Sequence, residues 1–292
     1  MHEPSWHEPW TGEDARTQTP GRNPRRLVAR IASGIFLGLL TLGGTYAGSY
    51  AFALLVAFMA IMMSWEWGGI VRGRRYDRGF LLHAAAIVVS LALAVVDYPV
   101  AGLIVLSAAA VVSAILNRAR GGLMSAAGFF YIGLPAVALV WFRNDAVNGF
   151  TAVMLIFSVV WAADTAAYVA GKSVGGAKLW PSISPNKTWA GSCSGLLASG
   201  VVGAVFSYLL LGEPSVYLIS CSLVLGFSAQ AGDLAESAFK RVYRIKDASN
   251  LIPGHGGFMD RLDGIAAAAA VAAVMALVIN VGQPANALLF GS

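Results

Sequence analysis

Apolar residues form nine long runs along the chain, and short polar segments separate them. A transmembrane helix needs about 20 predominantly apolar residues, so each run has a length that can cross a bilayer. The third and fourth runs are separated only by "DYP", in which Asp97 and Pro99 are typical of a tight turn. The pattern predicts an all-α integral membrane protein, a polytopic bundle of about nine transmembrane helices. The runs cover residues 27–47, 49–70, 79–96, 98–116, 123–142, 149–170, 189–211, 214–232 and 262–281.

The overall composition agrees with a membrane protein and excludes an ordinary soluble domain. Hydrophobic residues make up 57% of the 292 positions and charged residues only 12%, and the mean hydropathy is +0.68. A soluble globular domain carries about 25% charged residues. The two cysteines, Cys193 and Cys221, lie in different apolar runs without a CxxC motif. We therefore expect neither a disulfide framework nor a thiolate metal site.

Lysine and arginine are concentrated in every second connection between the apolar runs. If the N-terminus is cytoplasmic, 19 of the 20 basic residues fall on the cytoplasmic side, and Arg143 is the exception. Basic residues mark cytoplasmic segments in membrane proteins, so this bias supports both the orientation and the number of spans. We expect a multi-pass protein of the cell (inner) membrane with its active site on the cytoplasmic face. The cytoplasmic segments are the N-terminal tail and residues 71–78, 117–122, 171–188 and 233–261.

The polar residues divide the chain into three parts. Residues 1–26 are polar and rich in proline, and we expect a disordered N-terminal tail. Residues 27–147 are expected to form N-terminal membrane helices with little chemistry in their connections. The long segments after the sixth and eighth runs carry most of the reactive side chains. We therefore expect residues 148–292 to form a catalytic membrane region.

Four acidic residues flank the segment between the last two runs. Asp233, Glu236 and Lys240 are spaced three and four apart, so they share one face if this segment is helical. Asp260 and Asp263 lie three apart at the start of the last run. Carboxylates also cap helix N-termini, but capping requires only one acid. Carboxylate oxygens suit Mg²⁺ and neighbouring basic side chains suit phosphates, so the group indicates a site for a metal and a phosphate.

A glycine-rich turn immediately precedes these last two aspartates. Gly254, Gly256 and Gly257 surround His255 in "PGHGGFMD". Glycine permits backbone conformations closed to other residues and lets a ligand approach the main chain closely. Free N–H groups beside a helix start can bind an anion. The turn therefore favours phosphate binding, although a lone glycine-rich turn is weak evidence.

Residues 163–191 form a second candidate region. Asp164 lies within the sixth run, where an ionisable residue is a functional candidate or the partner of a buried basic residue. The following loop is basic and rich in hydroxyl groups, which is typical of phosphate binding at a membrane surface. The alternative is an ordinary positively charged cytoplasmic loop. Its candidate residues are Lys172, Lys178, Ser184, Lys187 and Thr188.

Glu66 lies near the end of the second run, between Trp65 and Trp67. The sequence leaves two interpretations open for this acid. It is either a surface carboxylate or part of a groove on the lipid side.

The segment 237–263, "SAFKRVYRIKDASNLIPGHGGFMDRLD", resembles the C-terminal signature of the phosphatidate cytidylyltransferases, or CDP-diacylglycerol synthases. The resemblance runs over 27 consecutive positions without a gap. "AADTAAYVAGK" and "KLWPSISPNKTW" also resemble internal motifs of that family, and the resemblance covers most of the chain from about residue 27. Ala190 departs from the pattern, because relatives often have a polar or acidic residue after "KTW".

The resemblance implies transfer of CMP from CTP to phosphatidate, giving CDP-diacylglycerol and pyrophosphate. It implies Mg²⁺ as cofactor, with room for a second cation. The second pKa of a phosphate monoester is about 6, so the attacking oxygen is already ionised and no strong general base is required. Positioning and charge neutralisation then carry the reaction. The implied partners are CTP, phosphatidate and membrane lipids, together with a second copy of the chain in a homodimer, and no nucleic acid.

The resemblance also implies roles for individual residues. Asp233, Asp260 and Asp263 are the expected metal ligands, and Asp164 is the candidate for a second cation. The residues expected at the reaction centre are Asp233, Asp260, Lys240, Arg241 and His255, with His255 as a hydrogen-bond donor to phosphate. The residues expected to bind the remaining phosphate groups are Lys172, Ser184, Lys187, Thr188, Lys246, Gly256, Gly257 and Arg261.

Two alternatives remain open from the sequence. A CTP-dependent polyprenol or phytol kinase, or a cytidylyltransferase for an isoprenoid lipid, would use a similar site with a different lipid acceptor. A secondary transporter would use Asp164 for ion coupling. A transporter predicts acids near the bilayer midplane, whereas these acids gather at the cytoplasmic edge beside basic residues.

Overall fold

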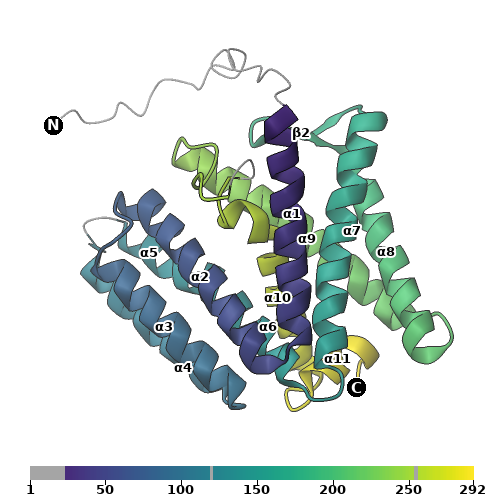
Figure 1. Ribbon diagram of the computed structural model, residues 1–292, viewed down its shortest axis with the longest axis horizontal. Coiled ribbons are helices and arrows are strands. Elements are labelled where there is room, and N and C mark those ends of the chain that lie inside the picture. The colour runs from purple at the N-terminus through teal and green to yellow at the C-terminus, as the bar shows by residue number, and fades with distance from the viewer. Residues whose placement is uncertain (1–23, 119–120, 253–255) are drawn as a thin grey trace.

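The computed structural model describes residues 24–118, 121–252 and 256–292, with side chains from residue 33 onward in the first range. Its described part is a helical bundle (Figure 1). Residues 1–23 of the predicted tail lie outside the described residues. The predicted boundary at residue 26 differs from the structure, because the first helix already begins at Pro24. Proline fits the first turn of a helix, where its missing N–H has no intrahelical partner.

The helices follow the predicted apolar runs closely. Eight apolar helices in the described ranges are long enough to cross a membrane, and they match the second to ninth runs. The first run corresponds to α1, whose described apolar part is the shorter stretch Ser33–Tyr46. The prediction of an all-α polytopic membrane protein is therefore confirmed. The helices are α1 (Pro24–Tyr46), α2 (Ser49–Arg72), α3 (Arg78–Val95), α4 (Pro99–Leu116), α5 (Gly122–Gly128), the π-helical η2 (Phe129–Gly133), α6 (Leu134–Asn144), α7 (Gly149–Ser173), α8 (Trp189–Leu211), α9 (Val216–Val242), α10 (Met259–Ile279) and α11 (Pro284–Phe290).

Two helix ends differ from the predicted runs in a way that concerns function. Helix α9 continues to Val242, whereas its apolar run was expected to end at residue 232. At 1.5 Å per residue its 27 residues span about 40 Å, more than the roughly 30 Å of a hydrocarbon core. Helix α10 begins at Met259 rather than at residue 262. All four acids of the predicted metal and phosphate site therefore lie on these two helices.

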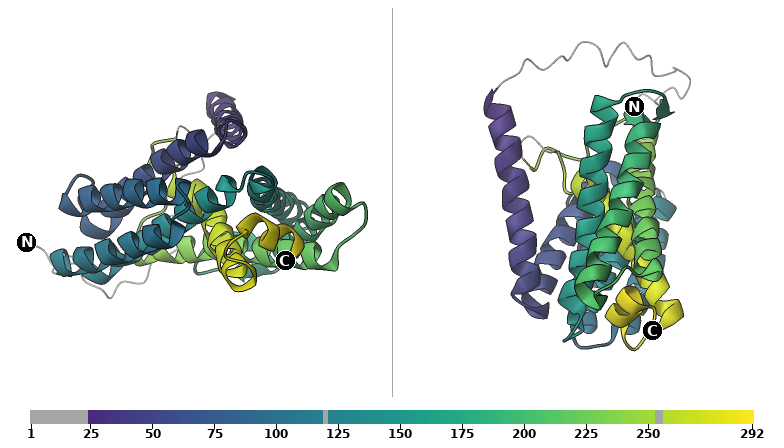
Figure 2. Two further views of the ribbon diagram at one scale, coloured as in Figure 1. Left: turned by 90° about the horizontal axis from the view of Figure 1, so that it is seen from below. Right: turned by 90° about the vertical axis from the view of Figure 1, so that its right-hand side faces the viewer.

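A short antiparallel hairpin joins α7 to α8. Strand β1 (Lys178–Trp180) pairs with β2 (Ser184–Thr188), with Lys178 opposite Thr188. The hairpin, the start of α1 and the segment after α9 lie at one end of the bundle, called here the hairpin end (Figures 1 and 2). Helix α11 lies at the opposite end (Figure 1). The sequence predicted a loop between α7 and α8, so the small sheet of β1 and β2 is an addition to the all-α fold.

Helix α10 packs between the N-terminal helices and the helices that carry the candidate residues. It packs against α6 on one side and against α7 and α9 on the other. Ala268, Ala269, Ala272 and Ala276 are fully buried along it. Small side chains allow the close helix approach by which membrane helices associate.

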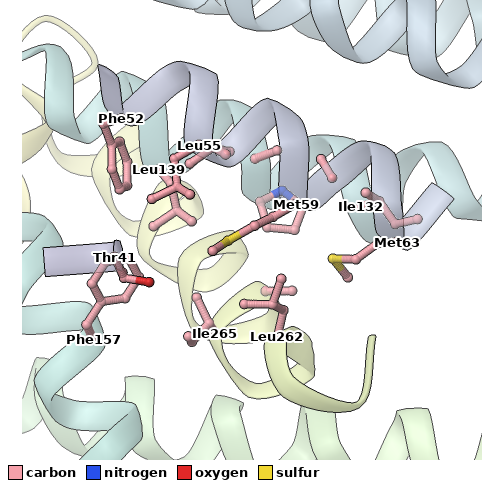
Figure 3. A pocket seen from close by; sticks show the side chains of 15 residues that line it. Thr41, Phe52, Leu55, Met59, Met63, Ile132, Leu139, Phe157, Leu262 and Ile265 are labelled. Carbon is pink, nitrogen blue, oxygen red and sulfur yellow. The ribbon is translucent and has the colours of Figure 1, made fainter. Parts of the chain in front are cut away.

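An apolar cavity of about 60 Å³ lies between α10 and the N-terminal helices (Figure 3). Helix α2 contributes the largest share of its wall, and α1, η2, α6 and α7 also line it. Leu262 and Ile265 contribute the α10 side. Because both residues flank Asp263 in sequence, apolar surface reaches the helix segment that carries this acid.

The α2–α3 turn at the hairpin end is fixed by one carboxylate. Asp77 accepts hydrogen bonds from Phe80 N at 2.8 Å and from Arg72 Nε at 2.8 Å, so it caps α3 and pairs with the end of α2. Burial alone would raise the pKa of Asp77, but the Arg72 and Phe80 donors outweigh burial and hold it below its usual value. Arg143, the one basic residue expected on the other side, lies at the opposite end and donates to the carbonyl of Thr45 at 2.7 Å.

Close helix contacts yield a test of this packing. A Cβ on Gly102 of α4 would lie 2.7 Å from the Ser90 carbonyl oxygen of α3, whereas nothing lies within 4 Å of one on Gly38. We expect Gly102→Ala to lower the free energy of unfolding by about 1–3 kcal/mol through overpacking. Gly38→Ala is the control, and it should be neutral or slightly stabilising because alanine favours helices. Thermal unfolding of both variants in detergent micelles measures the difference; equal midpoints would contradict the α3–α4 contact.

Candidate active site

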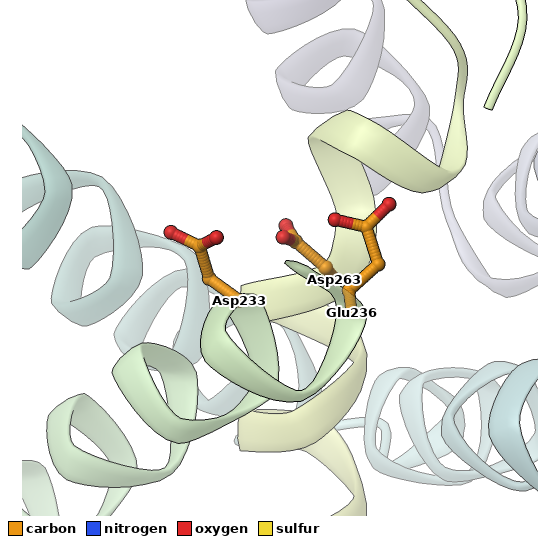
Figure 4. A group of neighbouring side chains, drawn as sticks. All are labelled: Asp233, Glu236 and Asp263. Carbon is orange, nitrogen blue, oxygen red and sulfur yellow. The ribbon is translucent and has the colours of Figure 1, made fainter. Parts of the chain in front are cut away.

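Three carboxylates meet where α9 passes α10. Asp233 and Glu236 of α9 and Asp263 of α10 each offer one oxygen, and these oxygens all lie within 4.8 Å of one another. The three side chains project to the same side of the two helices (Figure 4). Glu236 and Asp263 are buried, with 2% and 9% of their surface exposed. The residues on these two helices therefore form one acidic cluster, called here the carboxylate cluster.

The donor set of the carboxylate cluster fits a divalent cation. Glu236 Oε1 is buried and accepts no hydrogen bond from any described protein donor. A buried carboxylate oxygen without a donor is costly, and like charges held together raise that cost further. Three carboxylate oxygens at this spacing are the ligands that a hard cation prefers. The carboxylate cluster is therefore a candidate metal site.

Two lysines partly neutralise the carboxylate cluster. Lys240 Nζ lies 2.9 Å from Glu236 Oε2 and 2.6 Å from Asp260 Oδ1, so it joins α9 to the start of α10. Lys187 of the hairpin reaches across to Asp233, at 2.5 Å. Each ammonium group carries three N–H donors. Both lysines therefore retain at least one N–H group that can donate a hydrogen bond to an incoming phosphate.

A cavity of about 730 Å³ opens over the carboxylate cluster. Its wall combines the end of α7, the hairpin, the start of α8, the end of α9 and the start of α10. Both acidic and basic side chains line it, which suits a ligand that carries phosphates together with a metal. The predicted residues that line it are Asp164, Lys172, Lys187, Thr188, Asp233, Lys240, Asp260, Arg261 and Asp263.

Comparison with known proteins places this chain in a family. The model described as "Cytidylyltransferase family" matches residues 28–279. The chain belongs to the cytidylyltransferase family. The sequence resemblance is thereby confirmed.

Several relatives of this cytidylyltransferase are similar over most of their length. A protein of Brucella suis biovar 1 named phosphatidate cytidylyltransferase is 37% identical over 84% of this chain and 91% of its own. A protein of Staphylococcus haemolyticus with the same name is 32% identical over 82% of this chain and 93% of its own. The Bacillus subtilis protein of that name is 42% identical over a shorter part, 46% of this chain and 50% of its own.

Asp260 lines the cavity over the carboxylate cluster with both its oxygens engaged. Oδ1 accepts from Lys240, and Oδ2 accepts from the backbone N–H groups of Ala248 at 3.0 Å and Gly257 at 2.8 Å. It is not one of the three acids of the carboxylate cluster. These contacts favour an anchoring role for Asp260 over the predicted role as metal ligand, which stays a prediction.

The third acid of the carboxylate cluster is Glu236, whereas the sequence predicted Asp260 as a metal ligand beside Asp233 and Asp263. The spacing of Glu236 from Asp233 predicts that both lie on one helix face, but Glu236 is not among the predicted metal ligands. The buried position of Glu236 arises because α9 remains helical beyond residue 232, which apolar content alone did not indicate.

Three other predicted phosphate-binding residues make contacts with the protein's own backbone near the cavity. Arg241 Nε donates to the carbonyl of Ile183 at 3.3 Å and Nη1 to that of Ile245 at 3.4 Å, so this side chain joins the hairpin turn to the segment after α9. Ser184 pairs with Trp180 in the hairpin. The Thr188 hydroxyl accepts from Gly191 N at 3.1 Å and caps α8. Their predicted contacts with phosphate stay predictions.

The structure separates Lys246 from the cavity over the carboxylate cluster. Lys246 lines a neighbouring hollow of about 510 Å³ together with Arg75. Asp247 lines both hollows. His255, the predicted hydrogen-bond donor to phosphate, and Gly254 lie outside the described residues.

The two described glycines of the signature allow carboxylates to approach the main chain. Gly256 has φ +87°, and a Cβ there would lie 2.8 Å from Asp260 Oδ2. A Cβ on Gly257 would lie 2.5 Å from Glu66 Oε1. These glycines are predicted from the sequence to admit a ligand close to the main chain. In the structure the close neighbours are the protein's own acids, and contact with phosphate stays a prediction.

The carboxylate cluster predicts how metal affinity depends on single acids. We expect Glu236→Gln and Asp263→Asn each to weaken Mn²⁺ binding at least about 10-fold, because each removes one charged ligand. Asp260→Asn should weaken it less, since its oxygens accept hydrogen bonds from protein donors. Electron paramagnetic resonance of free Mn²⁺ measures the affinity in micelles. Asp145→Asn, in the α6–α7 turn, is the matched control, and wild-type affinity in Glu236→Gln would contradict the cluster.

Proposed function

We propose that this cytidylyltransferase transfers CMP from CTP to phosphatidate, giving CDP-diacylglycerol and pyrophosphate. The observation that carries the proposal is the carboxylate cluster flanked by Lys187 and Lys240 inside a large cavity. Long relatives named phosphatidate cytidylyltransferase support the choice of substrates. The all-α membrane fold suits a lipid acceptor.

The carboxylate cluster is proposed to hold Mg²⁺, with Asp164 available for a second cation. Asp164 lines the same cavity as Asp233 and Asp263. When bound, Mg²⁺ supplies positive charge for the phosphate oxygens of CTP. Lys187 and Lys240 then exchange part of their contact with carboxylates for contact with phosphates. Lys172 and Arg261 line the same cavity and are proposed to bind the pyrophosphate portion.

The reaction requires positioning more than proton transfer. An oxygen of the phosphatidate monoester forms a new bond to the α-phosphorus of CTP, and the bond from that phosphorus to the bridging oxygen breaks, releasing pyrophosphate. The attacking oxygen is largely ionised near neutral pH, because the second pKa of such a monoester is about 6. The chain's contribution is to hold both phosphates in line and to neutralise their mutual repulsion with Lys187, Lys240 and Arg261.

The apolar cavity of Figure 3 supports a lipid on the membrane side of this site. Leu262 and Ile265 line it, and Asp263 between them belongs to the carboxylate cluster. With about 60 Å³ it is too small for a whole acyl chain, so it marks where apolar surface reaches the reacting groups. The headgroup of a lipid lying there would point towards the carboxylate cluster.

We propose that the hairpin end is cytoplasmic and that the protein resides in the cell (inner) membrane with a cytoplasmic N-terminus. The bias of lysine and arginine supports this orientation. The start of α1 is at the hairpin end (Figure 2), and hairpin residues Lys187 and Thr188 line the polar cavity. Arg143 instead bonds to Thr45, near the far end of α1. The cavity residues fall within 148–292, which supports the proposed catalytic region. The homodimer stays a prediction.

A CTP-dependent lipid kinase is the nearest alternative function. Incubation of purified protein with CTP, phosphatidate and Mg²⁺ in mixed micelles distinguishes the two. CMP transfer releases pyrophosphate, whereas a kinase acting on an isoprenoid alcohol releases CDP. Pyrophosphate in amounts equal to CDP-diacylglycerol supports the proposal, and CDP formed only with an isoprenoid alcohol overturns it.

The same assay tests the site residues. We expect Asp263→Asn and Glu236→Gln to lower kcat/KM at least about 100-fold, which is about 2.7 kcal/mol of transition-state stabilisation. Asp260→Asn should also lose activity, because it releases Lys240 from its position. Asp145→Asn is the control and should keep wild-type activity. Full activity in both Asp263→Asn and Glu236→Gln would remove the carboxylate cluster from the mechanism.

A further inference from the structure

Glu66 is a buried carboxylate that the proposed reaction does not use. It belongs to α2, in the N-terminal part of the bundle, and only 1% of its surface is exposed. It does not line the cavity over the carboxylate cluster. From the sequence, Glu66 is either a surface carboxylate or part of a groove on the lipid side. Its burial excludes the first interpretation.

Both oxygens of Glu66 accept hydrogen bonds from the signature segment. Oε1 accepts from Ser249 Oγ at 2.5 Å and from Phe258 N at 2.9 Å. Oε2 accepts from Met259 N at 2.8 Å. Ser249 is itself buried. One side chain of α2 therefore holds both the middle and the end of the segment that leads into α10.

These contacts replace the local cap that α10 lacks. The residue before the helix, Phe258, already has helical dihedral angles and makes no side-chain capping bond. The first N–H groups of a helix have no intrahelical partner, and an acceptor must come from elsewhere. Glu66 supplies it to Phe258 and Met259, while Asp260 takes the N–H of Gly257. A carboxylate is the favoured group at this positive end of the helix.

The position of Glu66 is itself fixed. The neighbouring Trp67 donates its indole N–H to the carbonyl of Met124 at 2.9 Å and stacks on Phe239 of α9 at 4.5 Å between ring centroids. Helix α2 is thus held against α9, which carries Asp233 and Glu236. Gly257 packs so closely on Glu66 that no Cβ fits between them. This arrangement leaves the start of α10 little freedom to shift.

We propose that Glu66 is a positioning residue for the carboxylate cluster. It sets the place and rotation of the first turn of α10, so that Asp263 faces Asp233 and Glu236. The inference rests on the proposed function for its kinetic consequence, but its structural part concerns metal affinity and local order alone. A small displacement of a reacting group can cost a large factor in rate, which gives a capping residue on another helix a strong influence on the reaction.

Glu66→Gln tests this role with little change in size. The amide keeps one acceptor oxygen and turns an NH₂ group towards N–H donors, so at least one of the three bonds is lost. We expect Mn²⁺ affinity to fall about 10-fold, a loss of the size seen for groups that orient metal ligands. We also expect faster amide hydrogen exchange at residues 257–261. In the CTP assay, the Mg²⁺ concentration for half-maximal rate should rise by a similar factor.

Asp77→Asn is the matched control. Asp77, in the turn after α2, is also a carboxylate that caps a helix. It caps α3 instead of α10, and it pairs with Arg72. It should lower the thermal midpoint while leaving Mn²⁺ affinity within about 2-fold, because it touches none of the metal-orienting groups. An equal loss of affinity in Asp77→Asn and Glu66→Gln would mean that general destabilisation explains both, and would overturn the proposal.

Ser249→Ala provides a second variant that removes only one of the three bonds. Ser249→Ala should lower Mn²⁺ affinity and speed amide hydrogen exchange, as Glu66→Gln does, but to a smaller extent. If Glu66→Gln does not fold, Ser249→Ala provides the test. In the double variant the two effects should be less than additive, because they share a contact. Wild-type affinity and exchange in folded Glu66→Gln, or in Ser249→Ala if Glu66→Gln does not fold, would overturn the proposal. If the wild-type protein forms no CDP-diacylglycerol, the proposed function fails, while affinity and exchange still decide the role of Glu66.

Discussion

The structure depends on bringing several carboxylates together at the edge of an apolar bundle. Asp233, Glu236 and Asp263 repel one another, and two of them are withdrawn from water. Such a group stays fully ionised only with positive charge close by. Lys240, Lys187 and the candidate metal provide this charge, and the hairpin and the α9–α10 contact hold the lysines in place. The features around the carboxylate cluster follow from this one electrostatic requirement.

Lys240 has a central part in this balance because it contacts acids of two helices. Its bonds to Glu236 and Asp260 make the relation between α9 and α10 depend on charge as well as on alanine packing. A phosphate that accepts from Lys240 therefore also changes how firmly the two helices are joined. The proposed phosphate contact of Lys240 would therefore couple substrate binding to helix packing.

The sequence was sufficient for the fold but only partly for the site. Apolar runs predict membrane helices because the bilayer imposes a length and a composition on each span. The same pattern said nothing about the polar continuation of α9, so Glu236 was placed in the acidic group of the predicted site but not among its metal ligands. Asp260 resembles a metal ligand in sequence, and only its three hydrogen bonds distinguish it from Asp263. Glu66 lies 183 residues before Ser249, a distance over which local patterns carry no information.

The remote cap of α10 has a consequence for how the protein is made. Helix α2 emerges from the ribosome long before residues 249–259 exist, so Glu66 has none of its hydrogen-bond donors during most of synthesis. A carboxylate without donors is unfavourable within hydrocarbon. Until α10 arrives, this end of α2 has to stay in contact with water. Burial of Glu66 therefore follows the synthesis of the signature segment, and the N-terminal helices cannot reach their final packing before it.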